Sequence, residues 1–503
     1  MKKLSRELLA GNTLKVAHAP LKDRPIRVLQ FGEGNFLRAF VDWMIDVLNE
    51  KNLFDGAIRV VQPLSQGMGE MLNAQQGLYT LILRGVEDGK AAEHARIITA
   101  VKDCVNAYTE WDKVLETAKL DTLRFVFSNT TEAGISYSAE PFIPGETPKS
   151  FPAKVTALLA ERFKHFRGAP DKGLVMIPCE LINHNGAELK KCILRHAADW
   201  QLGAEFAAWV EQHNLFVNTL VDRIVAGYPR AEAPELCKRF GYEDNLLVCG
   251  EIFHLWVIEG PQSLGREIPF AEAGLNVILT DDQSPYRERK VRFLNGAHTG
   301  NVLAAFLHGF DFVDQMSSDS LTGGLLRAMI FEEIAPTVKL PEAEKNAFAE
   351  SVIERFLNPF AGHRLLSISL NSVAKWKVRI LPSLLDYVKI TGKLPEKLAF
   401  SLAALIAFYD CRKQPDGRFA GCGVERSYQV DDDADKLEFF AKVWSEKGND
   451  LPALVREVLA RTDFWGLDLN TVPGLAERVA ARLMVIRFEG IGAALTELAG
   501  GIQ

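Results

Sequence analysis

A lysine, an asparagine and a histidine occur close together in the second half of the chain, at Lys290, Asn295 and His298. Oxidation of a secondary alcohol needs a base for the hydroxyl proton and polar groups that hold the oxygen as charge shifts. Lysine can be that base when desolvation lowers its pKa, and an asparagine amide can hold the oxygen. On a regular α-helix these side chains spread over an arc of about 140°. The three side chains can face one cleft only if the long Lys290 side chain extends toward the other two or the helix bends near Gly296. An exposed lysine and a structural histidine are the alternative.

A glycine turn near the N-terminus indicates a dinucleotide cofactor, which would accept the hydride in such an oxidation. The apolar run 27–31 ends at Gly32-Glu33-Gly34, and apolar residues then recur at helical spacing over 36–48. Strand, glycine turn and helix together suit a pyrophosphate, since glycine lets the backbone approach closely and a helix start offers free N–H groups. A tight turn without a ligand is the alternative. The predicted cofactor-binding residues are Val28, Leu29, Gln30, Phe31, Gly32, Glu33, Gly34, Asn35, Phe36, Leu37, Arg38 and Ala39.

The glycine turn departs from the usual dinucleotide pattern in three ways. Leu37 stands where a third glycine is usual, and Glu33 would repel a phosphate unless its carboxylate points away, although Arg38 could offset that charge. The end of the second predicted strand, 60–65, contains no acid to bind a ribose 2′-hydroxyl. It also contains no Arg or Lys for a 2′-phosphate, and this missing cation alone favours NAD over NADP.

The elements around these motifs divide the chain into two predicted domains. Strand-like runs alternate with helical patterns in the first half, which predicts a Rossmann-like, doubly wound α/β domain over residues 1–284. Long amphipathic patterns then predict a mostly α-helical domain over 285–503. The expected strands are 27–31, 58–61, 79–83, 123–127 and 174–177, and the expected helices include 155–163, 289–307, 322–334, 342–356, 395–409 and 434–444.

Composition excludes several classes of protein. The chain has 503 residues, of which 48% are hydrophobic and 24% charged, as in globular proteins. Its formal charge of −7 argues against the basic surface that binding to a nucleic acid requires. The N-terminus lacks a secretory pattern, and the apolar stretch 398–409 is too short to span a membrane. Seven scattered cysteines indicate a reducing cytoplasm, and no local motif indicates a metal.

Several longer segments resemble one known family. Lys290, Asn295 and His298 match the K-x4-N-x2-H pattern of the polyol-specific long-chain dehydrogenases, the mannitol dehydrogenase family, and the turn at 32–39 is similar to that family's nucleotide loop. The resemblance covers nearly the whole chain and is closest for members that act on sugar acids. The segments that carry it are 30–43, 76–81, 127–137, 177–182, 185–186, 221–224 and 294–299.

The resemblance implies an activity and a set of roles. The expected reaction is reversible, NAD-dependent reduction of the hexuronate tagaturonate to altronate, with no metal. The expected partner is this small-molecule substrate, with no nucleic acid and no membrane. Fructuronate/mannonate or mannitol/fructose are the alternative substrates within the family, and a non-catalytic NAD-binding sensor is a different class. Lys290 is the implied acid/base, Asn185 and Asn295 flank the carbonyl oxygen, and His298 positions the substrate.

The sequence offers further substrate-binding candidates. Asp222 is expected near the substrate, with a structural salt bridge as an equal alternative. A hexuronate carries a carboxylate, so its site needs a cation, and Arg364 and Lys375 are the candidates, with an ordinary surface charge as the alternative for each. The sequence does not determine the oligomeric state.

Overall fold

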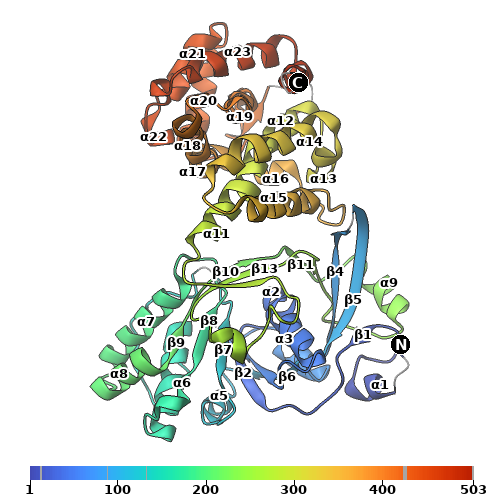
Figure 1. The fold of residues 1–503 in the computed structure, drawn as a ribbon, viewed down its shortest axis with the longest axis vertical. Coiled ribbons are helices and arrows are strands. Elements are labelled where there is room, and N and C mark those ends of the chain that lie inside the picture. The colour runs from blue at the N-terminus through green and yellow to red at the C-terminus, as the bar shows by residue number, and fades with distance from the viewer. Residues whose placement is uncertain (12–13, 88, 132, 423–426, 501–503) are drawn as a thin grey trace. The chain divides into compact units, whose positions relative to one another are not determined.

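The computed structural model describes residues 1–11, 14–87, 89–131, 133–422 and 427–500. These residues form two compact units (Figure 1). Unit 1 comprises residues 1–85 and 92–283, and unit 2 comprises 86–91 and 284–503. Each unit is described below by itself.

A six-stranded parallel sheet forms the centre of unit 1. Its strands run in the order β6-β3-β2-β7-β8-β9, so the chain leaves β2 toward one side and later returns to pair β7 on the other. Gln30 of β2 lies opposite Val60 of β3 and Phe127 of β7. This is the predicted doubly wound arrangement, and it is confirmed. The strands are β2 (Ile26–Phe31), β3 (Ala57–Gln62), β6 (Val101–Asn106), β7 (Phe125–Ser128), β8 (Val175–Pro178) and β9 (Leu215–Phe216).

Both faces of this sheet are buried, which explains why its strands are apolar without alternation. Val28 and Phe127 pack into one core with Met44 of the helix α3. Leu29 and Val126 point to the opposite face and pack into a second core. Helices cover that second face, and α6, α7 and α8 lie together beside β8 and β9 (Figure 1). The helices of unit 1 are α1 (Arg6–Ala10), α2 (Asn35–Arg38), α3 (Val41–Glu50), α4 (Gly69–Ala74), α5 (Trp111–Ala118), α6 (Phe151–Phe166), α7 (Asn185–Asp199), α8 (Ala204–His213), α9 (Ala233–Phe240) and α10 (Leu264–Glu267), with a 3-10 turn at Pro170–Lys172.

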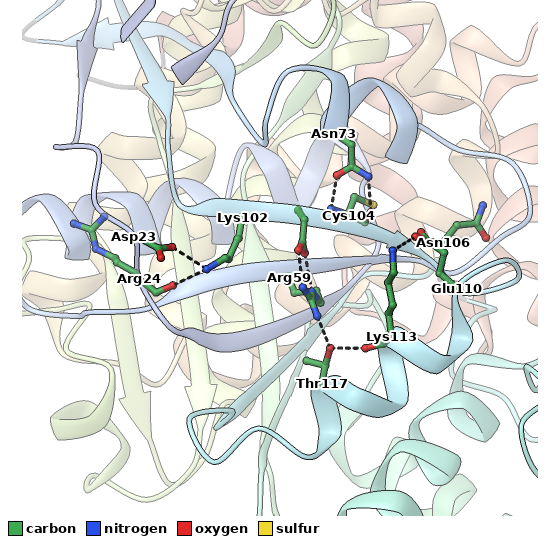
Figure 2. Close-up of polar contacts among 11 residues, drawn as sticks. Asp23, Arg24, Arg59, Asn73, Lys102, Cys104, Asn106, Glu110, Lys113 and Thr117 are labelled. Atoms are coloured by element: carbon green, nitrogen blue, oxygen red, sulfur yellow. Dashed lines mark hydrogen bonds and ion pairs between the residues drawn. The ribbon is translucent and has the colours of Figure 1, made fainter. Parts of the chain in front are cut away.

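The strand β6 forms one edge of the sheet, and side chains occupy part of that edge (Figure 2). The Asn73 amide donates to the Cys104 carbonyl at 2.7 Å and accepts from the Cys104 N–H at 2.8 Å. Lys102 bonds the Asp23 carboxylate at 2.8 Å, and Arg59 donates to the Thr117 hydroxyl at 3.0 Å (Figure 2). Of these contacts, the Asn73 amide uses backbone groups of the edge strand, at Cys104, and so limits pairing with another chain there.

Two smaller sheets complete unit 1. The predicted strand at 79–83 exists, but it belongs to a separate five-stranded sheet of order β1-β5-β4-β12-β11. A three-stranded sheet has the order β10-β13-β14. Sequence periodicity could not assign these strands to sheets, since pairing depends on remote segments. The strands are β1 (Ala17–His18), β4 (Tyr79–Glu87), β5 (Lys90–Ile98), β10 (Asn218–Asp222), β11 (Val225–Gly227), β12 (Val248–Glu251), β13 (Leu255–Glu259) and β14 (Val277–Thr280).

Unit 2 is mostly helical, as predicted, with one hairpin of β15 (Cys411–Lys413) and β16 (Phe419–Gly421). Among the described residues of this unit, Lys290–Gly296 and Met329–Ile334 are π-helices, and Ala335–Thr337 and Leu469–Thr471 are 3-10 turns. None of the helices in the described part of the chain is long and apolar enough to cross a membrane. The α-helices are α11 (Ser284–Arg289), α12 (Ala297–His308), α13 (Val313–Ser318), α14 (Ser320–Ala328), α15 (Glu342–Phe356), α16 (Leu365–Ser369), α17 (Ser372–Arg379), α18 (Leu381–Thr391), α19 (Glu396–Phe408), α20 (Ala434–Lys447), α21 (Leu451–Leu459), α22 (Thr462–Trp465), α23 (Leu475–Phe488) and α24 (Ile491–Gly500).

Candidate active site

The glycine turn lies at the carboxyl end of β2, where the strand order reverses between β2 and β7. Open α/β sheets bind their ligands at this point. Gly32 has a φ of +118°, and a Cβ there would lie 3.1 Å from the Asn129 carbonyl oxygen at the end of β7. A Cβ on Gly34 would meet nothing within 4 Å. The first glycine therefore makes the turn possible, and the second leaves open space beside the backbone, which fits a pyrophosphate.

The Glu33 side chain turns away from the glycine backbone toward the loop that follows β3. Its Oε1 accepts the Met68 N–H at 3.4 Å and lies 2.0 Å from where a Cβ on Gly67 would be. Partial burial raises the pKa of this carboxyl. The expected condition for a phosphate in the loop, an outward-pointing Glu33, is therefore met.

Arg38 is buried, and its guanidinium holds the glycine loop in place. It donates to the Glu33 carbonyl at 3.2 Å, to the Asn35 side chain at 2.7 Å and to the Leu246 carbonyl at 2.7 Å. Only 2% of Arg38 is exposed. The sequence offered Arg38 as a charge that could offset Glu33 and as a cofactor-binding residue, and the cofactor role remains a prediction. Its contacts show that it supports the loop, which the sequence alone did not predict.

The predicted helix over 36–48 is divided into α2 and α3, with a break at Ala39 and Phe40. Arg223 donates to the Ala39 carbonyl at 2.6 Å, and burial lowers the pKa of Arg223 to about 9. A buried cation from a remote strand end thus satisfies a backbone oxygen that a continuous helix would have used itself. Sequence periodicity could not predict this break, because Arg223, which stabilises it, is far away in the sequence.

A buried carboxyl lies under the same loop and gives a pH-dependent prediction. Asp42 accepts the Tyr79 hydroxyl at 3.0 Å, and burial raises the Asp42 pKa from 3.8 to about 7. The folded chain then keeps a proton that the unfolded chain releases, so stability falls as pH rises from about 4 to about 7. We expect Asp42→Asn to lack this slope, which is on the order of 1 kcal/mol per pH unit.

Urea unfolding at pH 4, 5.5 and 8 measures this effect of Asp42. The Asp42→Asn variant should gain stability relative to the wild type as pH rises. The control is Asp112→Asn, which replaces an exposed aspartate on α5. A stability difference that is the same at all three pH values would contradict the assignment.

Asn185 lies at the start of α7 and is fully buried. Its amide nitrogen donates to the carbonyls of Pro178, Glu180 and Thr219 at 3.0–3.2 Å, and its oxygen accepts from the N–H of Gly186 and Thr219. These bonds join the end of β8 to β10. Its expected role at the substrate oxygen remains a prediction, and that role requires one of these bonds to be exchanged for the substrate.

Asp222 ends β10 and is 4% exposed, beside the buried Arg223. Glu180 is also buried and accepts from Ser128 and Thr130, so it ties the ends of β7 and β8 together. Residues 128–130 of the segment 127–137 therefore lie at the same carboxyl end of the sheet as Gly32, and Glu132 of that segment lies outside the described residues. The substrate role of Asp222 remains a prediction.

In unit 2, Lys290 and Asn295 lie in the π-helix Lys290–Gly296, and His298 follows in α12. A π-helix bonds residues five apart, so Lys290 and Asn295 lie nearer to one face than an α-helix allows. All three residues are partly exposed. From the sequence, a common face required either a reaching Lys290 side chain or a bend near Gly296, and the structure has a wider helical turn just before Gly296. Such turns recur at functional sites.

The His298 ring is packed between neighbours of unit 2. It stacks on Phe356 with centroids 3.9 Å apart and meets His363 edge-on at 5.6 Å. Burial, and then the neighbouring charges of His363 and Arg355, hold its pKa well below the usual range, so the ring is neutral near pH 7. Its Nε2 is buried and has no hydrogen-bond partner among the described residues. A buried polar atom of this kind is available to a ligand.

Cations gather around His298. Arg379 and Lys375 of α17 and Arg355 of α15 all lower the His298 pKa, and Arg379 donates to the Thr299 hydroxyl at 3.3 Å. Lys375 donates to the Ile368 carbonyl at 2.9 Å. Sequence reasoning found Lys375 but missed Arg379, although their separation of four residues places both on one helix face.

Arg364, the other expected cation, is exposed, and its guanidinium lies 5.2 Å from the ring centroid of Phe312. Its carboxylate-binding role remains a prediction. No group of three metal-ligating side chains occurs among the residues that the structure describes.

The fold and the glycine loop define a class, the α/β dinucleotide-binding proteins with a helical second unit. The family model of the mannitol dehydrogenase Rossmann domain matches residues 26–271, and the model of the mannitol dehydrogenase C-terminal domain matches residues 282–487. The chain belongs to the mannitol dehydrogenase family. The family expected from the sequence segments is confirmed.

Similar proteins with curated names cover nearly the full length. The chain is 48% identical over 487 residues to the altronate oxidoreductase of Pectobacterium carotovorum, with 96% of this chain and 99% of that protein covered. It is 46% identical to the altronate oxidoreductase of Escherichia coli strain IAI39, with 97% and 99% covered.

Two solved structures share the fold at 23% identity. One is a D-sorbitol dehydrogenase in substrate-free form, with a TM-score of 0.78 and 98% of this chain and 100% of that chain covered. The other is a Pseudomonas fluorescens mannitol 2-dehydrogenase in ternary complex with NAD and D-mannitol, with a TM-score of 0.66 and 99% of each chain covered.

Proposed function

We propose that this chain is a nicotinamide-dependent oxidoreductase that interconverts the hexuronate tagaturonate and altronate. The observation that carries the proposal is the full-length likeness, at 45–48% identity, to proteins named altronate oxidoreductase. Oxidation of the altronate hydroxyl removes a hydride and a proton, so the chemistry needs a hydride acceptor and a base.

Lys290 is the proton donor and acceptor in this proposal. In reduction, its ammonium group gives a proton to the nascent alkoxide, and in oxidation its neutral amine takes the hydroxyl proton. Asn295 holds the same oxygen, and its position five residues from Lys290 in a π-helix supports a joint role. Asn185 supplies the second amide. His298 binds a substrate hydroxyl, supported by its unpartnered Nε2.

The cofactor of the proposal is NAD, which supplies the hydride acceptor when bound. The residues present fit a dinucleotide, since Gly34 leaves open space and Gly32 forms the turn at the switch point of the sheet. Arg38 then acts on the loop rather than on the cofactor, because its donors are bonded to Glu33, Asn35 and Leu246.

The substrate carboxylate is bound, in this proposal, by the cations near His298. Lys375 and Arg379 lie on one face of α17, and burial lowers the pKa of both. A partly desolvated cation gains more from an anionic ligand than an exposed one does. A neutral polyol would offer no negative charge to these cations, so the cluster favours a sugar acid over mannitol.

Loss of NADH absorbance, with tagaturonate, fructuronate and fructose offered separately and NADPH in parallel, tests the proposal. We expect rapid oxidation of NADH with tagaturonate. Preference for fructuronate or fructose would keep the chemistry and reject the substrate. A folded protein that binds NADH but oxidises it with none of these substrates would reject the enzyme in favour of a sensor.

A further inference from the structure

The end of the second strand of the dinucleotide-binding sheet lacks its usual acid in this chain. In such folds a carboxylate at that place accepts a hydrogen bond from the ribose 2′-hydroxyl of NAD. Here β3 ends at Gln62, and the segment 62–69 contains neither an acid nor a base. The Gln62 amide is occupied, since it donates to the Leu64 carbonyl at 2.9 Å and accepts the Gly69 N–H at 3.0 Å.

A carboxylate nevertheless reaches this loop from another segment. Glu33, between the two glycines of the turn, is partly buried and directs Oε1 toward Gly67 and Met68. Gly67 makes the approach possible, because a Cβ there would lie 2.0 Å from Glu33 Oε1. Glu33 thus lies between the glycine backbone, which borders the pyrophosphate in this fold class, and the loop after β3, which borders the adenosine ribose.

We infer that Glu33 is the residue that binds the adenosine ribose and selects NAD over NADP. This inference rests on the proposed nicotinamide cofactor and adds the residue that distinguishes the two forms. The carboxylate accepts from the 2′-hydroxyl of NAD and repels the 2′-phosphate of NADP. Arg38, whose charge acts on the Glu33 carboxyl, is bonded to the Glu33 carbonyl, Asn35 and Leu246 and is 2% exposed, so it does not serve a 2′-phosphate.

Calorimetric titration with NADH, NADPH and 2′-deoxy-NADH, without substrate, tests Glu33 directly. We expect the wild type to bind NADH more tightly than NADPH. Glu33→Gln and Glu33→Ala should reduce this preference about tenfold or more, as expected for loss of a charged hydrogen-bond partner. Glu33→Ala should weaken NADH binding but leave 2′-deoxy-NADH binding unchanged, because that ligand lacks the hydroxyl that Glu33 accepts from.

Gly67→Ala provides a second variant that keeps the carboxylate and displaces it. Gly67 does not have a positive φ, and the atoms that a Cβ would meet are the flexible ends of Glu33 and Gln62. The variant should therefore fold and should lose preference for NADH as the Glu33 variants do. Glu70→Gln, which removes an exposed charge from the first turn of α4, is the control and should leave the preference unchanged.

The outcomes separate the inference from the proposed function. Equal preference for NADH in the wild type, Glu33→Ala and Gly67→Ala would overturn the role of Glu33 and leave the nicotinamide-dependent function in place. A wild type that prefers NADPH would also overturn it. A wild type that binds none of the three nucleotides would overturn both the inference and the proposed cofactor.

Discussion

Replacement of Lys290 by alanine is expected to lower turnover of tagaturonate by about 10²–10⁴-fold, the usual contribution of general acid–base catalysis. The loss arises because neither Asn295 nor the neutral His298 can supply the proton that a lysine ammonium supplies. Binding of NADH should survive, since the variant keeps the glycine turn and the Arg38 contacts that hold it. Steady-state kinetics with tagaturonate, together with NADH titration, measure both effects.

Two further variants define what Lys290 contributes. Lys290→Arg keeps the positive charge but cannot release its proton at physiological pH. It should be nearly as inactive as Lys290→Ala if the residue transfers a proton, and nearly normal if only its charge matters. Lys393→Ala removes an exposed lysine of unit 2 and should leave turnover unchanged. Near-full turnover in Lys290→Ala would reject the assignment.

The second large effect is expected at the cations of α17. Arg379→Ala should lower kcat/KM for tagaturonate about tenfold to a hundredfold, because a charged hydrogen bond to the carboxylate is lost. The loss should fall mainly on KM, since the carboxylate does not react. Any turnover of fructose, which has no carboxylate, should change little, and this substrate therefore separates carboxylate binding from damage to the fold.

The sequence candidates are compared in the same assay. Lys375→Ala and Arg364→Ala test whether either cation shares the carboxylate, and Arg412→Ala removes an exposed arginine of unit 2 as a control. Lys375 lies four residues before Arg379, whereas the Arg364 guanidinium lies over Phe312, so we expect the larger effect from Lys375. An unchanged KM for tagaturonate in Arg379→Ala, Lys375→Ala and Arg364→Ala would reject this cluster as the carboxylate site.

Local patterns predicted much of the fold. The apolar runs at 27–31 and 58–61 became β2 and β3, and the helical pattern at 342–356 became α15 with the same bounds. These predictions succeed because side-chain periodicity is encoded within each segment. The mannitol dehydrogenase family was also identified from sequence segments, and the matched domains confirm it.

The same patterns were less informative where remote contacts decide the structure. The break between α2 and α3 depends on Arg223, and the wider turn at Lys290 adjoins Gly296, where a Cβ would lie 3.2 Å from the Arg379 carbonyl. The assignment of 79–83 to a separate sheet likewise depends on its pairing with β12. None of these partners is near in sequence.

By itself, the sequence determined which residue types this protein has for its chemistry and on which local elements they lie: a glycine turn after the first strand of the parallel sheet, and Lys290, Asn295 and His298 on one helical stretch. The tertiary structure decided where the charges point. It directed Glu33 into the loop after β3, buried Arg38 as a support of the glycine turn, and brought Arg379 close to His298. The physical reason is that side-chain direction and burial depend on packing between segments far apart in the chain, and these contacts leave no local periodicity.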